Sequence, residues 1–299
     1  MNAPWLGEFP IDLETARAVI QNQFPQLAHQ SIRFLGSGWD NQAFLVDEIW
    51  VFRFPHRQLA VELINKECRW LPALAKQLPL PTSTPIWIGE PSELFPFPFA
   101  GSPFIPGESL DWTLHAGERL THRIGDFLRK LHDVPIHGET PADDLRRTDI
   151  PFRVELLRKQ VSLGGFNSED ELAIERAFEA ALNARSATHR TWVHGDLYPR
   201  HVIVQSDGEV SGIIDWGDLH VGDPALDVSV VFALLDPIDQ EPFWSAYGNA
   251  DPELRIRAAF RALHYGIVLR SFGREASDEA IARTADRYLR SALKFFERY

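Results

Sequence analysis

The sequence predicts an α+β fold in which a small, β-rich lobe is joined to a larger, mainly helical lobe. Short β-type segments separated by turn residues fill much of the first third of the 299-residue chain, whereas helical periodicity dominates the rest. A proline- and phenylalanine-rich stretch at 95–107 separates the two parts, and its prolines favour an extended connection. Since the length fits about two domains, we expect an N-terminal lobe at 1–104, with a hinge at its end, and a C-terminal lobe at 105–299.

The N-terminal lobe is expected to begin with three consecutive β-strands, at residues 31–35, 42–46 and 49–54. A glycine-containing loop at 36–41 separates the first two strands, and the acidic pair Asp47-Glu48 forms a hairpin turn between the last two. A helix follows, because apolar residues recur at steps of three and four from Ala60 to Ala75. The prolines that come next end this helix, and a further strand is expected at 85–88.

The C-terminal lobe is expected to be helical apart from one β-type insert. Apolar residues mark the face of a helix at 120–131 and, more weakly, of another at 172–182. Short β-type segments lie at 202–204 and 210–214, and amphipathic helices are expected from 223 to 299. Helices on both sides of a short insert give this lobe its mainly helical character.

The composition excludes several classes of protein. Thirty Lys and Arg residues against 42 Asp and Glu give a formal net charge of −12, which argues against a nucleic acid partner because phosphate backbones require a basic face. The single Cys68 excludes an intramolecular disulfide. Neither a signal peptide nor an apolar run approaching the roughly 20 residues of a membrane span is visible. We therefore expect a cytoplasmic protein without a membrane partner.

The most informative segment runs from Val193 to Val204 and contains His194-Gly195-Asp196 and His201, with Asp215 following. The β-type segments beside these acidic residues would place Asp196 and Asp215 at the mouth of one hairpin. Two carboxylates with a nitrogen ligand suit metal-assisted phosphoryl transfer, in which one carboxylate deprotonates a hydroxyl and the other groups hold magnesium against a triphosphate. The alternative is that both carboxylates only cap turns. Their nineteen-residue spacing and the sequence Asp215-Trp216-Gly217-Asp218 favour the catalytic interpretation.

These motifs resemble the catalytic and metal-binding motifs of the aminoglycoside phosphotransferase family, which also contains macrolide, choline and related small-molecule kinases. The resemblance covers nearly the whole chain and implies a protein-kinase-like fold, with a nucleotide-binding N-terminal lobe and a catalytic, acceptor-binding C-terminal lobe. It also implies that Asp196 is the catalytic base and that Asp215 binds the metal ion. ATP or GTP is then the expected phosphoryl donor, with Mg²⁺ or Mn²⁺ as the metal.

His201 departs from the pattern of that family, in which an asparagine is the usual second metal ligand. Imidazole can bind a divalent ion, but magnesium prefers oxygen ligands. His201 is therefore expected to bind the metal directly or through water, to favour manganese, or to hydrogen-bond a phosphate. Simple packing at the start of the strand is the alternative. A similar string occurs in macrolide phosphotransferases, so the departure does not imply inactivity, and it favours a substrate of that branch.

A basic residue and a glycine loop complete the expected nucleotide site. Arg53 occupies the third-strand position at which kinases commonly carry lysine, and its expected partner is Glu67 on the following helix, in preference to Glu62. The segment Gly36-Ser37-Gly38 has the flexibility to direct backbone N–H groups at phosphates. A simple turn is the alternative interpretation of these glycines.

Other polar residues of the C-terminal lobe have structural interpretations. His194, Asp223 and Asp227 are expected to anchor the catalytic loop, and Asp223 is placed to cap the next helix. A solvated, salt-bridged helix face is expected to carry five arginines: Arg255, Arg257, Arg261, Arg270 and Arg274.

The acceptor site should lie in the helical lobe and face Asp196. Carboxylates there would suit an amino sugar, and aromatic rings would suit a larger lactone or a quaternary ammonium group. For each candidate taken singly, a surface or core position is the preferred interpretation. The candidates are Asp111, Trp112, Trp216, Asp218, Asp236, Asp239, Phe243, Trp244 and Tyr247.

The sequence therefore predicts a small-molecule O-phosphotransferase that acts on an aminoglycoside- or macrolide-like antibiotic. A metabolite such as choline, a sugar or homoserine is the alternative acceptor. A non-catalytic, kinase-like module that binds a nucleotide or another ligand is a further alternative, which the retention of Asp196, Asp215 and Glu67 opposes. A protein kinase is disfavoured, because no long activation segment ending in Ala-Pro-Glu is visible.

Overall fold

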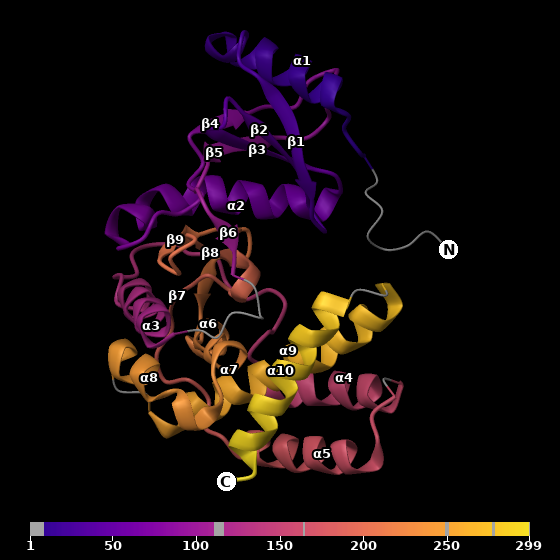
Figure 1. Ribbon diagram of the computed structural model, residues 1–299, viewed down its shortest axis with the longest axis vertical. Helices are drawn as coiled ribbons and strands as arrows, with labels where there is room; N and C mark the ends of the chain where they lie inside the picture. Colours follow the sequence, from indigo (N-terminus) through magenta and orange to yellow (C-terminus); the bar gives the residue numbers. More distant parts are fainter. Residues whose placement is uncertain (1–8, 111–116, 164, 249–250, 277–278, 299) are drawn as a thin grey trace. The chain divides into compact units, whose positions relative to one another are not determined.

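The computed structural model describes residues 9–110, 117–163, 165–248, 251–276 and 279–298, and the chain divides into two compact units. The first unit contains the described residues up to Gln77, together with Pro81–Pro106 and Gly212–Leu219. The second contains Leu78–Leu80, Gly107–Ser211 and the described residues from His220 onward. A five-stranded sheet lies in the first unit and most helices lie in the second (Figure 1), which confirms the predicted α+β class. The functional division at 104 and 105 stays a prediction.

The first unit is built on an antiparallel sheet whose strand order is β1-β2-β3-β5-β4. Its strands are β1 (Ile32–Ser37), β2 (Asn41–Val46), β3 (Trp50–Pro55), β4 (Trp87–Gly89) and β5 (Phe99–Pro103). Asp47 and Glu48 adopt positive φ angles of 53° and 55°, which match the twist of the strands that they join. The three expected N-terminal strands and the hairpin turn are thus confirmed.

The proline-rich stretch at 95–107 is more than a connection, because it contains β5. This strand lies inside the sheet and pairs with β3 on one side and β4 on the other. Phe99 of β5 stacks on Phe54 of β3, with ring centroids 4.5 Å apart, and neither side chain is exposed. The stretch is therefore held by both main-chain hydrogen bonds and core packing, which its prolines alone did not indicate.

Two helices accompany this sheet, α1 (Leu13–Gln23) and α2 (Gln58–Leu74). The sequence analysis predicted α2 and missed α1. The start of α1 does carry a local indication, since the Asp12 side chain caps it by accepting from the backbone N–H of Thr15. Three residues at helical spacing, Ala16, Val19 and Ile20, then bury one face of α1 in the aromatic core of the unit.

The second unit contains eight helices among its described residues: α3 (Glu118–His132), α4 (Ile150–Leu163), α5 (Ser168–Leu182), α6 (Ala225–Val228), α7 (Val231–Leu234), α8 (Glu241–Tyr247), α9 (Pro252–Ala276) and α10 (Glu279–Phe296). Its short strands are β6 (Glu108–Ser109), β7 (Thr191–Val193), β8 (Val202–Val204) and β10 (His220–Gly222); β9 (Val210–Ile213) leads from this unit into the first. The sheets are β10-β7 and β6-β8-β9. The expected helices at 120–131 and 172–182 and the β-type insert are confirmed, whereas α4 was not predicted.

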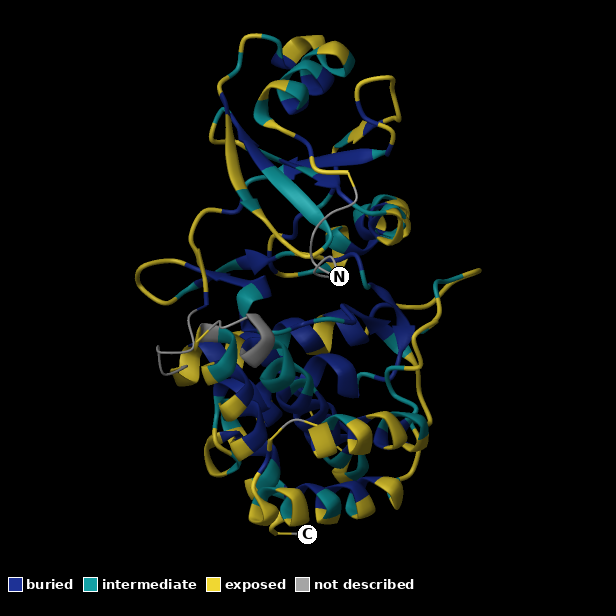
Figure 2. Ribbon diagram, turned by 90° about the vertical axis from the view of Figure 1, so that its right-hand side faces the viewer, coloured by how far each residue is buried: buried dark blue, intermediate teal, exposed yellow. Residues whose placement is uncertain are grey.

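The long helices α9 and α10 pack against each other in the second unit (Figure 1). Gly266 permits their close approach, because a Cβ atom there would lie 2.6 Å from Cγ of Leu289. Helices of this unit bury one side and expose the other, as the blue and yellow faces in Figure 2 show. No helix in the described ranges is long and apolar enough to cross a membrane.

Gly101 of β5 tests the packing of the first unit. A Cβ atom at Gly101 would lie 2.7 Å from the ring of Phe52, which is itself fully buried and has little room to shift. We expect Gly101→Ala to lower the free energy of unfolding by about 1–3 kcal/mol through this overlap, as measured by urea denaturation. The matched control is Gly36→Ala on β1, where an added Cβ meets nothing within 4 Å. A Gly101→Ala protein as stable as this control would contradict the packing described.

Candidate active site

The first unit contains a buried ion pair between a strand and a helix. Arg53 on β3 places Nη2 2.5 Å from Oε2 of Glu67 on α2. The Glu67 side chain is almost completely buried, while Glu62 is exposed. Burial raises the pKa of Glu67, and the positive charge of Arg53 opposes that rise. For Arg53, burial alone would lower the pKa, but the negative charges of Glu67 and Asp215 keep it above its ordinary value. The pair expected from the sequence is therefore present, whereas its role in binding a nucleotide stays a prediction.

Asp215 belongs to the same unit, and a tight turn presents its carboxylate. Its φ angle is +64°, a left-handed conformation that aspartate tolerates better than most residues. The next residue, Trp216, is fully buried, and its indole N–H donates to the carbonyl of Ile213 at 3.0 Å. The Asp215 side chain is 52% exposed and lies 3.7 Å from Nη1 of Arg53. The turn thus anchors itself through Trp216 and leaves a carboxylate accessible beside a cation.

The glycine loop of the first unit spans the end of β1 and the turn before β2. Gly36 and Ser37 are the last residues of β1, where the pairing with β2 shifts register, and the N–H of Gly38 donates to the carbonyl of Asn41 at 2.9 Å. A Cβ at Gly36 would meet nothing within 4 Å, so packing within the protein does not require glycine there. Phosphate contacts by this loop stay a prediction.

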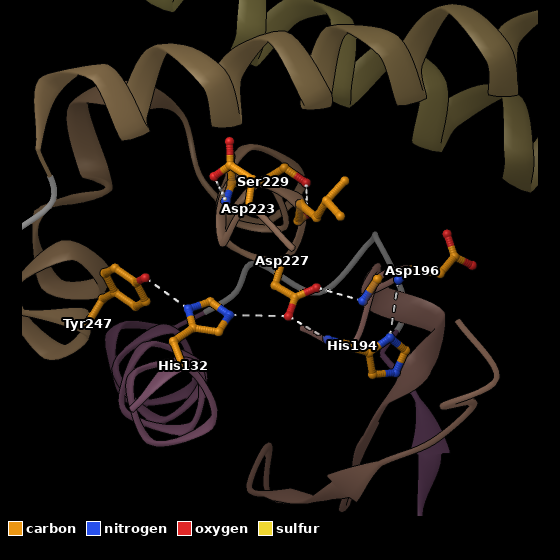
Figure 3. A network of polar contacts seen from close by, with 10 residues as sticks. His132, His194, Asp196, Asp223, Asp227, Ser229 and Tyr247 are labelled. Carbon is orange, nitrogen blue, oxygen red and sulfur yellow. Dashed lines mark hydrogen bonds and ion pairs between the residues drawn. The ribbon is translucent and has the colours of Figure 1, made fainter. Parts of the chain in front are cut away.

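The second unit fixes the loop that carries Asp196. This loop leaves β7, and its first two backbone N–H groups, from His194 and Gly195, both donate to the carboxylate of Asp227, at 2.7 and 2.9 Å (Figure 3). Asp227 lies on α6 and has no exposed surface. Gly195 adopts a φ angle of +86°, which a residue with a side chain rarely does. The expected anchoring role of Asp227 is confirmed.

A chain of hydrogen bonds supports Asp227 from the other side. His132 on α3 lies 3.2 Å from Oδ2 of Asp227 through Nε2 and 2.8 Å from the hydroxyl of Tyr247 through Nδ1 (Figure 3). Because an ionised carboxylate can only accept, Nε2 of His132 is the donor. Burial alone would raise the pKa of Asp227, but the hydrogen bond and charge of His132, together with the donors of the loop, hold it below its ordinary value.

Two histidines fix the backbone of Asp196 itself. The N–H of Asp196 donates to Nδ1 of His194 at 3.3 Å, and the carbonyl of Asp196 lies 2.9 Å from Nδ1 of His201. A carbonyl oxygen can only accept, so Nδ1 of His201 carries a proton, and in the neutral ring the lone pair lies on Nε2. Histidine ligands of metal ions commonly donate their other nitrogen to a carbonyl in this way. The loop-fixing role expected of His194 is thus confirmed.

The carboxylate of Asp196 has a partner that the sequence analysis missed. It is half-buried, points away from Asp227 (Figure 3) and accepts a hydrogen bond from the hydroxyl of Tyr265 at 2.5 Å. Arg261 lies over the ring of Tyr265, 4.1 Å from its centroid. The spacing of Arg261 and Tyr265, four residues apart in a helix, was an available indication, because such residues share one helix face.

The expectation of a solvated arginine face is wrong for Arg257 and Arg261, which are each only 8% exposed. Arg257 pairs with Asp223 at 2.7 Å, and Arg261 lies beneath Tyr265. Asp223 also accepts from the N–H of Ala225, the first residue of α6, although the residue at the N-cap position of that helix is Pro224. For Arg257 the sequence contains no local indication of burial, because its partner Asp223 lies 34 residues earlier in the chain.

Four of the nine candidate acceptor residues are core residues. Trp216, Phe243, Trp244 and Tyr247 are buried, in agreement with the preferred interpretation of each. Asp111 and Trp112 lie outside the described residues, and Asp218 is half-buried.

Asp236 and Asp239 line a cavity of about 790 Å³ within the second unit, beside Arg287 and Lys294. Asp236 pairs with Lys294 at 2.8 Å. Among the candidates that the structure describes, Asp236 and Asp239 are the two exposed ones.

Across the described residues, no group of three or more His, Cys, Asp and Glu side chains gathers as a complete metal site. The two expected metal ligands belong to different units, Asp215 to the first and His201 to the second. Magnesium in nucleotide sites is usually held by one or two carboxylates with the substrate phosphates supplying further oxygens. The accessible carboxylate of Asp215 and the Nε2 lone pair of His201 fit that chemistry as single ligands.

Asp227 gives a direct test of the loop anchor. Asp227→Asn replaces one acceptor oxygen by an NH₂ group that faces other donors, so we expect the free energy of unfolding to fall by more than about 2 kcal/mol. Urea denaturation measures this loss, and Asp207→Asn in an exposed turn is the matched control, with an expected change within about 0.5 kcal/mol.

The stabilisation by Asp227 should also depend on pH. Because the pKa of Asp227 in the folded state lies below its value in the unfolded state, this stabilisation is present above the unfolded pKa and is lost as the pH falls through the folded pKa. The gap between wild type and Asp227→Asn should therefore narrow below about pH 4, and a gap that stays constant with pH would contradict the anchor.

Comparison with known proteins identifies relatives of this chain. A model of the phosphotransferase enzyme family matches residues 31–263. Viomycin phosphotransferase from Streptomyces vinaceus is 32% identical over 130 residues, which is 41% of this chain and 43% of that protein. The matches to two curated relatives span 60% and 43% of the lengths of those proteins.

Solved structures agree with this chain over nearly its whole length. The GDP complex of wild-type aminoglycoside 2′-phosphotransferase-IIIa is 24% identical, with a TM-score of 0.76, and the match covers 95% of this chain and 99% of that one. The macrolide 2′-phosphotransferase MphH from Brachybacterium faecium is 21% identical, with a TM-score of 0.64 and coverage of 94% and 98%. These likenesses confirm the predicted kinase-like fold. Together with the family match over most of the sequence, they lead to the conclusion that the chain belongs to the phosphotransferase enzyme family.

Proposed function

We propose that the protein transfers the γ-phosphoryl group of ATP or GTP to a hydroxyl of a small molecule, an aminoglycoside- or macrolide-like antibiotic. The observation that carries the proposal is the fixed position of Asp196, a half-buried carboxylate on a loop whose backbone is held by Asp227, His194 and His201. Membership of the phosphotransferase family supports the reaction class. The neighbouring structures named for aminoglycoside and macrolide phosphotransferases support the class of acceptor.

In this proposal Asp196 is the general base. Its carboxylate accepts the proton of the acceptor hydroxyl as the hydroxyl oxygen attacks the γ-phosphorus atom. A bond forms between that oxygen and phosphorus, the bond from phosphorus to the bridging oxygen of the β-phosphate breaks, and the products are a phosphomonoester and a nucleoside diphosphate. A rigid loop favours this role, because a general base must lie within hydrogen-bond reach of the proton that it takes.

The nucleotide phosphates are proposed to contact the first unit. Arg53 would pair with the phosphates while Glu67 holds its guanidinium in place, as the basic residue and its helix partner do in kinases. The backbone of Gly36, Ser37 and Gly38 would lie against the same phosphates. Asp215 and His201 would hold a divalent ion, which neutralises charge on the phosphates when bound. Because His201 offers nitrogen rather than oxygen, Mn²⁺ is an alternative to Mg²⁺.

The direct test is acceptor-dependent diphosphate release by the purified chain. We expect release with Mg²⁺ or Mn²⁺ and ATP or GTP in the presence of one class from a panel of aminoglycosides, macrolides, choline and simple sugars. Asp196→Asn should lower kcat by about 10²–10⁴-fold, because its amide cannot accept the proton. Asp207→Asn, the same exchange in an exposed turn, serves as control and should keep the rate. Diphosphate release that only choline or a sugar stimulates would show that the acceptor is a metabolite rather than an antibiotic. Nucleotide binding without diphosphate release in the presence of any acceptor would contradict the proposed transferase activity.

The buried pair of the first unit is tested separately. Arg53→Met removes the guanidinium and keeps much of the side-chain length, so we expect the KM for the nucleotide to rise about ten- to a hundredfold, as for the loss of a hydrogen bond to a charged group. The KM for the acceptor should change little. Arg33→Met, which breaks an exposed ion pair with Glu48 in the same sheet, is the matched control. An unchanged nucleotide KM in a folded Arg53→Met protein would refute the role given to Arg53.

A further inference from the structure

The contact between Tyr265 and Asp196 is explained by neither the sequence motifs nor the proposed reaction. Tyr265 lies in the middle of α9, far from the catalytic loop in sequence, yet its hydroxyl donates to Oδ1 of Asp196 at 2.5 Å. We infer that Tyr265 is a positioning residue that fixes the orientation of the Asp196 carboxylate, and that Arg261 holds Tyr265 in place. The inference rests on the proposed function, since it assigns a role within that reaction.

Tyr265 can act only as a donor to Asp196. Burial of its hydroxyl and the charge of Asp196 raise the pKa of Tyr265 well above its ordinary value, so the phenol stays protonated over the working range of an enzyme. A hydrogen bond from a neutral donor to a carboxylate is shorter and stronger than one between neutral groups. The bond therefore restrains the side chain of Asp196 in addition to the two histidines that restrain its backbone.

Arg261 lies one helical turn before Tyr265, with its guanidinium 4.1 Å from the centroid of the tyrosine ring, and is itself 8% exposed. Its Nη1 lies 2.9 Å from Nδ1 of His264. A guanidinium only donates, so His264 accepts and is neutral. Burial and the charge of Arg261 lower the pKa of His264 well below its ordinary value, which agrees with this assignment.

Because His264 is neutral, it does not balance the positive charge of Arg261. A buried cation is costly without an anion. Burial alone would lower the pKa of Arg261, but its interactions with Tyr265 and Asp196 keep it above the ordinary value. Asp196 is therefore an anion that acts on Arg261, and both residues contact Tyr265, Asp196 at its hydroxyl and Arg261 at its ring.

Aromatic rings close the cluster on the remaining sides. The ring of Tyr288 on α10 lies nearly parallel to that of Tyr265, with centroids 5.5 Å apart and an angle of 18°. Tyr198, from the turn after Asp196, approaches Tyr265 at 6.5 Å between centroids and His201 at 4.2 Å. The ring of Tyr265 is therefore packed between two tyrosines and an arginine, and its hydroxyl has little freedom to turn away from Asp196.

Tyr265→Phe in the full chain tests the inference, because it removes only the hydroxyl and keeps the packed ring. With the acceptor found in the panel, we expect kcat to fall about ten- to a hundredfold, as for the loss of a hydrogen bond to a charged group. The KM for the nucleotide should stay within about twofold, since the bond restrains the base rather than the phosphates. Incorporation of a ring-fluorinated tyrosine at position 265, which retains the hydroxyl, should restore the rate to within a few-fold.

The control is Ser271→Ala, which removes another half-buried hydroxyl from α9, one that donates to the carbonyl of Ile267. This variant should keep the wild-type kcat. A Tyr265→Phe enzyme with wild-type kcat would overturn the inference, as would an equal loss with the fluorinated tyrosine or with Ser271→Ala, which would indicate a structural effect of α9. A wild-type protein without transferase activity would instead contradict the proposed function, and the inference with it.

Discussion

The carboxylate of Asp227 is the constraint on which the rest of the second unit's site depends. It has no exposed surface, so its oxygens must find donors within the protein. They find them in the N–H groups of His194 and Gly195 and in the imidazole of His132. With the start of the loop fixed in this way, the following residues place Asp196 where its backbone and its side chain are both restrained. The carboxylate that we propose as the base is thereby held in one orientation by the protein itself, as the preorganisation of a catalytic site requires.

Each unit contains its own group of interacting charged residues. Arg53, Glu67 and Asp215 form one group within the first unit, while Arg261, Tyr265 and Asp196 form another within the second. We proposed phosphate binding for the first group and proton transfer for the second. Because the groups share no residue, substitutions in one should alter nucleotide affinity and substitutions in the other should alter the chemical step, and kinetics can separate them.

The sequence predicted best those elements and contacts that are indicated by a local pattern or by a recognisable motif. The strands at the N-terminus followed from their composition and turn residues. The pair of Arg53 with Glu67 and the anchoring role of Asp227 followed from the resemblance to kinases and to the phosphotransferase family. The burial of Arg261 and the bond from Tyr265 did not, because nothing local tells which face of a helix meets a loop some 69 residues away. Helix α4 was not predicted, because its apolar residues form only a weak stripe along the helix. Strand β5 was not predicted either, because prolines are rare inside a sheet and the prolines of this stretch indicated an extended connection.

Phosphorus NMR of the products tests the central claim most directly, namely that Asp196 serves transfer to a hydroxyl. Wild-type protein would be mixed with the nucleoside triphosphate, divalent metal and the acceptor panel. The account predicts a phosphomonoester resonance that grows as the γ-phosphate resonance is lost, and no such resonance with Asp196→Asn. Accumulation of inorganic phosphate without a phosphomonoester, or an equal yield from Asp196→Asn, would contradict it.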